Sequence, residues 1–289
     1  MRSSNPVLTH LGDGSSQQRA GTPYNQAPPG QNPFQQYPQQ GYGQHPQQHP
    51  QQYPQQGYPP VVTGETMTLD DVVVRTVMLL ALTGVAGALA WVLIPDTGSV
   101  STLAMFGSML AGLALGLVIA FKRITNPALI AVYALVQGVL LGVVSRWFEA
   151  RYPGIVIQAV LGTFSIFFVM AALYKLRVLR ATPRFTKFVI GALIAFVLVS
   201  FINFIAYMFG FDTGLVDNGT ASVNPMAFLF CGIGIVIGAL TFILDFAEVE
   251  SAIRYGLPEK YAWYCAFGLL VGLIFLYWQV LQMLSYLRR

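Results

Sequence analysis

The sequence predicts an all-α polytopic membrane protein: seven transmembrane helices preceded by a disordered N-terminal tail. Of the 289 residues, 55% are hydrophobic and only 10% are charged, with a mean hydropathy of +0.57, whereas soluble proteins carry about 25% charged residues. A soluble globule could not hide so much apolar surface from water. Seven apolar runs of about 20 residues, the length that spans a bilayer, also follow one another along the chain. The lipid bilayer is therefore the first expected partner.

Residues 1–64 form the predicted tail, which is rich in Gln, Pro, Gly and Tyr. Tyr or His followed by Pro-Gln-Gln recurs at residues 37–40, 45–48, 49–52 and 53–56. Such a composition cannot build a hydrophobic core, and its prolines favour extended or disordered chain. The tail is then either a plain solvated segment or a segment that docks or self-associates.

The predicted membrane domain, residues 65–289, begins with a capping box. Thr68 is followed three residues later by Asp71, just before an apolar run, which predicts the start of a helix. Asp71 and Arg75 then lie four residues apart and can pair. The seven spans are expected near residues 75–95, 101–121, 127–148, 155–174, 187–209, 226–246 and 262–285. Prolines stand in the gaps, where helices end: Pro95, Pro127, Pro153, Pro183, Pro225 and Pro258.

Glycines within the spans recur at a spacing of four. Small residues at this spacing let membrane helices approach closely, so a tight bundle is the leading interpretation over any contact with a ligand. The pairs with this spacing are Gly112 and Gly116, Gly138 and Gly142, Gly234 and Gly238, and Gly268 and Gly272.

The basic residues indicate topology rather than nucleic-acid binding. They lie at the ends of apolar runs instead of forming a patch with aromatics, so the net charge of +4 does not suggest a nucleic-acid partner. The positive-inside rule predicts a cytoplasmic tail and an external C-terminus in the plasma membrane. Ten basic residues lie on the side of the tail: Arg75, Lys122, Arg123, Lys175, Arg177, Arg180, Arg184, Lys187, Arg254 and Lys260. Four lie on the other: Arg146, Arg151, Arg288 and Arg289.

Several classes of chemistry are excluded from the bundle. All three histidines, His10, His45 and His49, lie in the tail, which leaves no histidine for catalysis or for a metal site among the spans. Cys231 and Cys265 fall inside apolar runs and are expected to be buried thiols without a disulfide. We therefore expect a protein that is not an enzyme and has no cofactor.

Polar groups at membrane depth are the remaining candidates for function. Gln137, Asn203 and Gln279 are neutral amides within the third, fifth and seventh spans. Polar residues at this depth are functional hypotheses by default, but an interhelical hydrogen bond also explains an amide. They are secondary candidates.

The strongest candidate is the acidic cluster at the end of the sixth span. Asp245 follows an unbroken apolar run, and on a continuing helix Glu248 lies on the same face. Their carboxylates repel each other and could offer hard oxygen ligands to a cation such as Ca²⁺. Glu250 falls on another face and can pair with Arg254. The alternative is that the cluster is simply the solvated end of the helix.

Together with the motifs given below, residues 66–289 resemble the Bax inhibitor-1 family, in particular its bacterial branch. The likeness depends on the order of six short segments: TMTLDDV (66–72) with Arg75, NP (126–127) with QG (137–138), RATPRFTK (180–187), LDF (244–246), GLP (256–258) and LYWQ (276–279). The resemblance implies six helices around a central seventh and a pH-sensitive cation leak, chiefly of Ca²⁺, governed by two aspartates. It also implies that the protein could instead regulate a membrane protease or a stress response.

The resemblance places the first of these aspartates at Asp245. The position of the second, in the seventh span, holds Gln279, and an acid common in the third span is replaced by Gln137. If the sixth and seventh spans form a hairpin, Asp245 and Gln279 should differ in depth by roughly 16 Å. A direct contact between the two is not expected, which leaves Asp245 alone or with Glu248 as the predicted switch.

Overall fold

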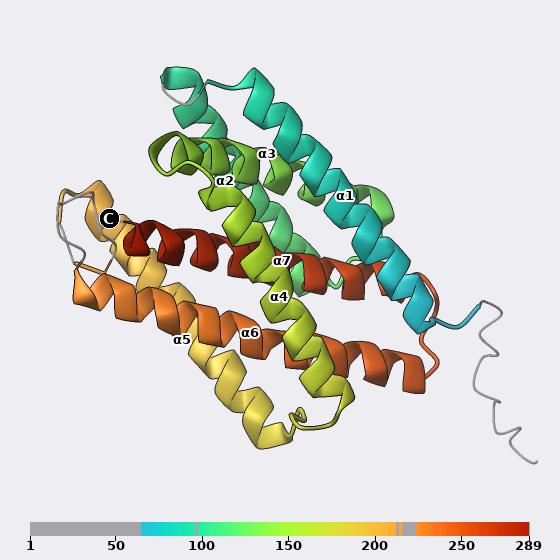
Figure 1. Ribbon diagram of the computed structural model, residues 1–289. Helices are drawn as coiled ribbons and strands as arrows, with labels where there is room; N and C mark the ends of the chain where they lie inside the picture. The colour runs from blue at the N-terminus through green and yellow to red at the C-terminus, as the bar shows by residue number, and fades with distance from the viewer. Residues whose placement is uncertain (1–64, 96–97, 212–213, 216–223, 289) are drawn as a thin grey trace, which may run out of the picture. The chain divides into compact units, whose positions relative to one another are not determined.

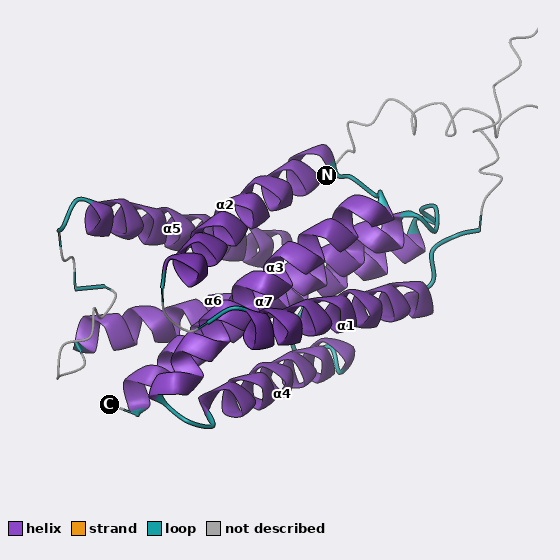
Figure 2. Ribbon diagram, turned by 90° about the horizontal axis from the view of Figure 1, so that it is seen from above, coloured by secondary structure: helices purple, strands orange, loops and turns teal. Residues whose placement is uncertain are grey.

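The computed structural model describes residues 65–95, 98–211, 214–215 and 224–288, so the predicted tail lies outside the described residues. Seven helices make up this part of the chain and all seven are long and apolar enough to cross a membrane. Figures 1 and 2 show them packed as a bundle. They are α1 (Leu69–Leu93), α2 (Ser99–Lys122), α3 (Pro127–Arg151), α4 (Ile155–Lys175), α5 (Pro183–Met208), α6 (Pro225–Arg254) and α7 (Tyr261–Leu287).

The helix starts follow from local side-chain chemistry. The capping box of α1 is complete, because Thr68 accepts from the backbone of Asp71 and the Asp71 carboxylate accepts from the backbone of Thr68. Asn126 and Asn224 cap α3 and α6, each followed by proline at the first helical position. Proline is favoured there because its missing N–H would have had no partner within the helix. The predicted spans are confirmed, while α6 runs on to Arg254, past the expected end near residue 246.

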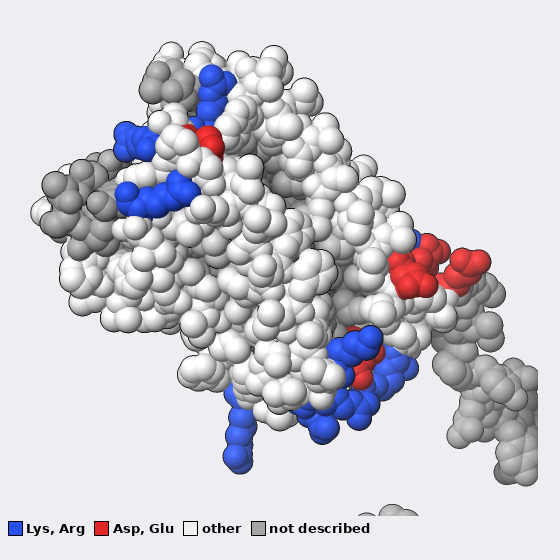
Figure 3. Space-filling view, in the orientation of Figure 1, with Lys and Arg blue, Asp and Glu red and all other residues white. Residues whose placement is uncertain are grey.

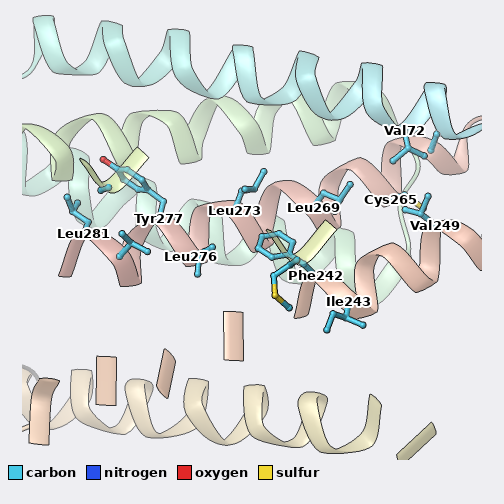
Figure 4. Close-up of a cluster of buried hydrophobic side chains, with 14 of the residues drawn as sticks. Val72, Phe242, Ile243, Val249, Cys265, Leu269, Leu273, Leu276, Tyr277 and Leu281 are labelled. Carbon is cyan, nitrogen blue, oxygen red and sulfur yellow. The ribbon is translucent and has the colours of Figure 1, made fainter. Parts of the chain in front are cut away.

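Helix α7 lies at the centre. Of its membrane-length window 67% is buried, against 11% for α5, and it packs against α1, α3, α4 and α6. Figure 4 shows part of the core, in which Leu269, Leu273 and Leu276 of α7 meet side chains such as Phe242 of α6. The remaining two helices lie further out, α2 along α3 and α5 along α6. The expected central position of the seventh helix is confirmed, but of the six other described helices only α1, α3, α4 and α6 pack along it, and α2 and α5 lie outside them.

Helices α1 and α3 meet at glycines. A Cβ added to Gly138 would lie only 2.5 Å from the carbonyl oxygen of Thr83 and 2.6 Å from Cβ of Ala86. No side chain fits between two backbones at such a distance, so glycine is required there. The spacing of Gly138 and Gly142 therefore marks a true close approach.

On the face seen in Figure 3, charged side chains gather at the two ends of the bundle, and the surface between them is almost free of charge. We call the end at which α1, α3, α5 and α7 begin the proximal end, and the other the distal end. The belt between them exposes many large apolar side chains, as a surface in contact with lipid does.

Candidate functional site

Asp245 lies near the proximal end of α6 and faces α7. A Cβ added to Gly268 would lie 3.6 Å from Oδ1 of Asp245, and one added to Gly272 would lie 3.4 Å from Oδ2. The two glycines therefore make room for the half-buried carboxylate between the helices. Among the described residues, no hydrogen-bond or ion-pair partner for Asp245 is found. We call this place, formed by Asp245, Gly268 and Gly272, the α6–α7 seam.

An aromatic cluster forms the apolar side of the seam. Phe242, one turn before Asp245, is fully buried. Its ring packs edge-on against Phe167 of α4, with centroids 5.2 Å apart, and lies beside Phe246 at 6.3 Å. This packing fixes α6 against α4 beside Asp245.

Glu248 lies one turn closer to the proximal end and is exposed. Its carboxylate accepts a hydrogen bond of 3.2 Å from the hydroxyl of Tyr261, the first residue of α7. Its charge also acts on Asp245. The structure therefore brings the two primary candidates, Asp245 and Glu248, to one end of the α6–α7 interface.

Glu250 takes no part in this seam. It lies on the surface, accepts a hydrogen bond of 2.7 Å from Arg254 four residues on, and accepts another from the hydroxyl of Tyr174 in α4. The expected pairing with Arg254 is confirmed, and it accounts for Glu250 as a surface ion pair.

Gln279 lies at another depth of the same interface. Its side chain is buried and packs against Gly234, where an added Cβ would lie 2.8 Å from Cδ of Gln279. Its backbone carbonyl accepts a hydrogen bond of 3.1 Å from the thiol of Cys231. Gly234 precedes Asp245 by eleven residues, or about 16 Å along a helix. The structure therefore does not bring Gln279 and Asp245 together, in agreement with the depth expected from the hairpin.

The other two amides lie elsewhere in the bundle. Gln137 of α3 donates a 3.2 Å hydrogen bond to the hydroxyl of Tyr133 and packs on Gly112 of α2, while its Oε1 is buried and finds no partner among the described residues. Asn203 is buried on α5. Neither residue contributes to the α6–α7 seam.

A clamp beside the seam was not predicted from the sequence. Residues 65–67 pair in the antiparallel sense with the loop between α6 and α7: Met67 donates to the carbonyl of Leu257 at 2.9 Å, and Glu259 donates to that of Glu65 at 3.0 Å. Arg75 forms an ion pair with the carboxylate of Glu259, in addition to the predicted and longer contact with Asp71 at 3.8 Å. Pairing over such a separation leaves no local signal in the sequence.

The position of Gly268 beside Asp245 could have been predicted from the sequence. Asp245 precedes Leu257, in the turn, by twelve residues, and Gly268 follows it by eleven. In an antiparallel hairpin, residues equally far from the turn lie at the same level, so counting outward from Leu257 would have placed Gly268 beside the acid. As to metals, no group of three His, Cys, Asp or Glu side chains suited to hold an ion is present in the part of the chain that the structure describes.

One comparison with known proteins identifies a family. The model of a family described as Bax inhibitor 1 like matches residues 5–289, almost the whole chain. The comparison with individually curated proteins gave no match.

Proposed function

Because the chain belongs to the Bax inhibitor 1 like family, we propose that this multi-pass membrane protein forms a pH-sensitive cation leak in the plasma membrane, with Ca²⁺ as a permeant ion. The proximal end faces the cytoplasm in this proposal, since it carries ten of the fourteen Lys and Arg residues that flank the spans. The C-terminus is then external. The proposed role needs neither a catalytic group nor a cofactor.

The observation that supports the proposal is a carboxylate without a described partner, half-buried between two helices of the core. An ionised carboxylate in apolar surroundings needs a counter-charge, a hydrogen bond or water. The small glycines Gly268 and Gly272 lie opposite Asp245 on α7. The negative charge of Glu248 lies close by, toward the proximal end, and carboxylate oxygens are the ligands that Ca²⁺ prefers.

In this proposal the seam acts as a switch, because its packing differs between the ionised and the protonated state of Asp245. With Asp245 ionised, water or a cation must enter between α6 and α7 to solvate it. With Asp245 protonated, the neutral side chain packs against Gly268 and Gly272, and the attraction for a cation falls. A proton therefore shifts the population between an occupied and a dry seam.

Ca²⁺ flux into proteoliposomes tests this proposal. We expect the flux of the parent protein to change between about pH 6 and about pH 8, where buried carboxyl groups can change charge, and we expect Asp245→Asn to abolish that dependence. Glu250→Gln is the matched control: it removes an acid from the same helix, but one that is already paired with Arg254. Equal flux in Asp245→Asn and the parent at every pH would refute the assignment.

A second candidate function is favoured by the clamp. Residues 65–67 attach the start of the membrane domain to the loop between α6 and α7, so a partner that bound the preceding segment would act next to the seam. We propose, as the alternative, a non-conducting regulator or scaffold of a membrane protease or of a stress response. Crosslinking of the full chain and of a chain lacking residues 1–64 tests it, and an unchanged set of crosslinked partners would contradict a role of the tail.

A further inference from the structure

Met67, in the clamp, is one of the most completely buried large side chains of the protein. Only 2% of its surface is exposed, whereas its neighbours Glu65, Thr66 and Thr68 are exposed. A segment that only ran over the surface would not bury a large apolar side chain, because burial on this scale needs a socket in the core. The clamp is therefore anchored by a side chain as well as by its backbone.

The socket of Met67 is the proximal end of the core cluster. Buried residues of three helices belong to this end: Val72 of α1, Val249 and Ala252 of α6, and Ala262 and Cys265 of α7. Figure 4 shows Val72, Val249 and Cys265 gathered where the three helices meet. Cys265 precedes Gly268 of the seam by about one turn. This end of the cluster therefore lies between the seam and the solution at the proximal end.

A local explanation covers only part of this packing. Met67 precedes the N-cap Thr68, and Val72 is the fourth residue of α1, so the two apolar residues occupy the positions of a hydrophobic staple. A staple needs contacts within one helix start alone. Here the N–H of Met67 also donates to the carbonyl of Leu257, in the loop between α6 and α7. The same residue therefore joins the start of α1 to the α6–α7 hairpin, which a staple does not require.

The clamp is small enough to detach without the unfolding of a helix. Residues 65–67 precede α1, and two backbone hydrogen bonds and the burial of Met67 hold them to the hairpin. Arg75 provides a separate attachment from within α1, because it forms an ion pair with Glu259 and lies over the ring of Trp263, 5.4 Å from the centroid. Detachment of the clamp would therefore empty the socket and leave α1 held against α7.

We propose that the clamp is an autoinhibitory plug: Met67 closes the proximal end of the α6–α7 interface, and the way from the proximal solution to Asp245 opens when residues 65–67 leave the loop. The purpose of such a plug rests on the proposed cation leak, since a leak that is regulated needs a closed state. The closure itself does not rest on it, because it is a property of the packing. Access to the interface, rather than flux, is therefore the quantity to measure.

Cys265 reports on the closure, because it is buried in the same cluster and the chain has only one other cysteine, Cys231. In full-length protein carrying Cys231→Ala, the rate at which a water-soluble maleimide alkylates Cys265 follows the population in which the interface is open. Met67→Ala should raise this rate by about tenfold to a hundredfold, the factor by which burial of a methionine side chain shifts an equilibrium, and Met67→Leu should keep it slow. Met170→Ala is the matched control, since it truncates a buried methionine of α4 in the same cluster and should leave the rate unchanged.

A crosslink tests the closure without removing a core side chain. Thr66 and Pro258 are paired in the antiparallel sense between two flanking hydrogen bonds, so their Cα atoms lie about 4.5 Å apart, within reach of a disulfide. In the double variant Thr66→Cys with Pro258→Cys, oxidation should slow the alkylation of Cys265, read from the mass of its peptide, and reduction should restore it. Equal rates in Met67→Ala, Met170→Ala and the parent, or before and after reduction of the crosslink, would overturn the plug. Rates as expected in a protein that passes no Ca²⁺ would contradict the cation leak and leave the plug standing.

Discussion

Replacing single glycines of α7 by alanine tests how tightly the α6–α7 seam is closed. At Gly272 an added Cβ would lie 2.9 Å from Cε1 of Phe242, whereas at Gly268 the nearest atom, Oδ1 of Asp245, is 3.6 Å away. The first distance is shorter than van der Waals contact and the second is an ordinary one. Phe242 is fully buried against Phe167, so its ring cannot move aside without disturbing α4.

The expected magnitude is a sum of two opposing effects. Alanine in place of glycine within a helix stabilises by about 1 kcal/mol, and this gain is common to Gly268→Ala and Gly272→Ala. Overpacking a filled core costs about 1–3 kcal/mol and applies to Gly272→Ala alone. We therefore expect Gly272→Ala to be less stable than Gly268→Ala by about 1–3 kcal/mol, or about 2–12 °C in Tm for a chain of this size.

Thermal unfolding of the two purified variants in the same detergent, beside the parent, gives the comparison directly. Gly268→Ala should melt at or slightly above the parent. Equal Tm values for the two variants, or a lower value for Gly268→Ala, would contradict this expectation, because either result would mean that α6 and α7 do not pack as closely as their backbones indicate.

Substitutions at three further contacts probe other parts of the bundle. Arg75→Glu breaks the ion pair with Glu259 and should lower Tm by several degrees, and the charge-swapped double variant Arg75→Glu with Glu259→Arg should recover part of the loss; a double variant no better than the sum of the single ones would show that the pair is not coupled. Gly138→Ala should destabilise by at least about 3 kcal/mol, because its Cβ would meet backbone, while Gly84→Ala, with nothing within 4 Å, should melt no lower than the parent. Tyr277→Phe removes a buried 2.7 Å hydrogen bond and should cost about 1 kcal/mol in a denaturation experiment, and an unchanged stability would argue against that bond.

The number of helices and their starts could be predicted because both depend on neighbouring residues. An apolar run of membrane length, a capping side chain such as Thr68 and a proline such as Pro127 act within one or two turns. The pairing of Glu250 with Arg254 was predictable for the same reason, since it spans one turn of one helix.

The faces of the helices could not be predicted in the same way. Helix α6 is apolar on nearly every side, because one side meets α7 and the others meet lipid or further helices, so its periodicity does not indicate which residues face the core. Arg75 forms its shorter ion pair with Glu259, 184 residues away. The sequence predicted only the ion pair with Asp71, four residues away. Long-range pairs of this kind need the arrangement of the helices, which local patterns do not contain.

Glycines with the same spacing of four residues make two different kinds of helix contact in this bundle. Gly138 of α3 faces backbone and Cβ atoms of α1. Gly268 and Gly272 of α7 have the same spacing but face a carboxylate and an aromatic ring of α6. The first contact leaves no room for a side chain, whereas the second accommodates the carboxylate of Asp245. The clamp of residues 65–67 joins the start of α1 to the loop between α6 and α7, so a pull on that segment would act on both α1 and this loop.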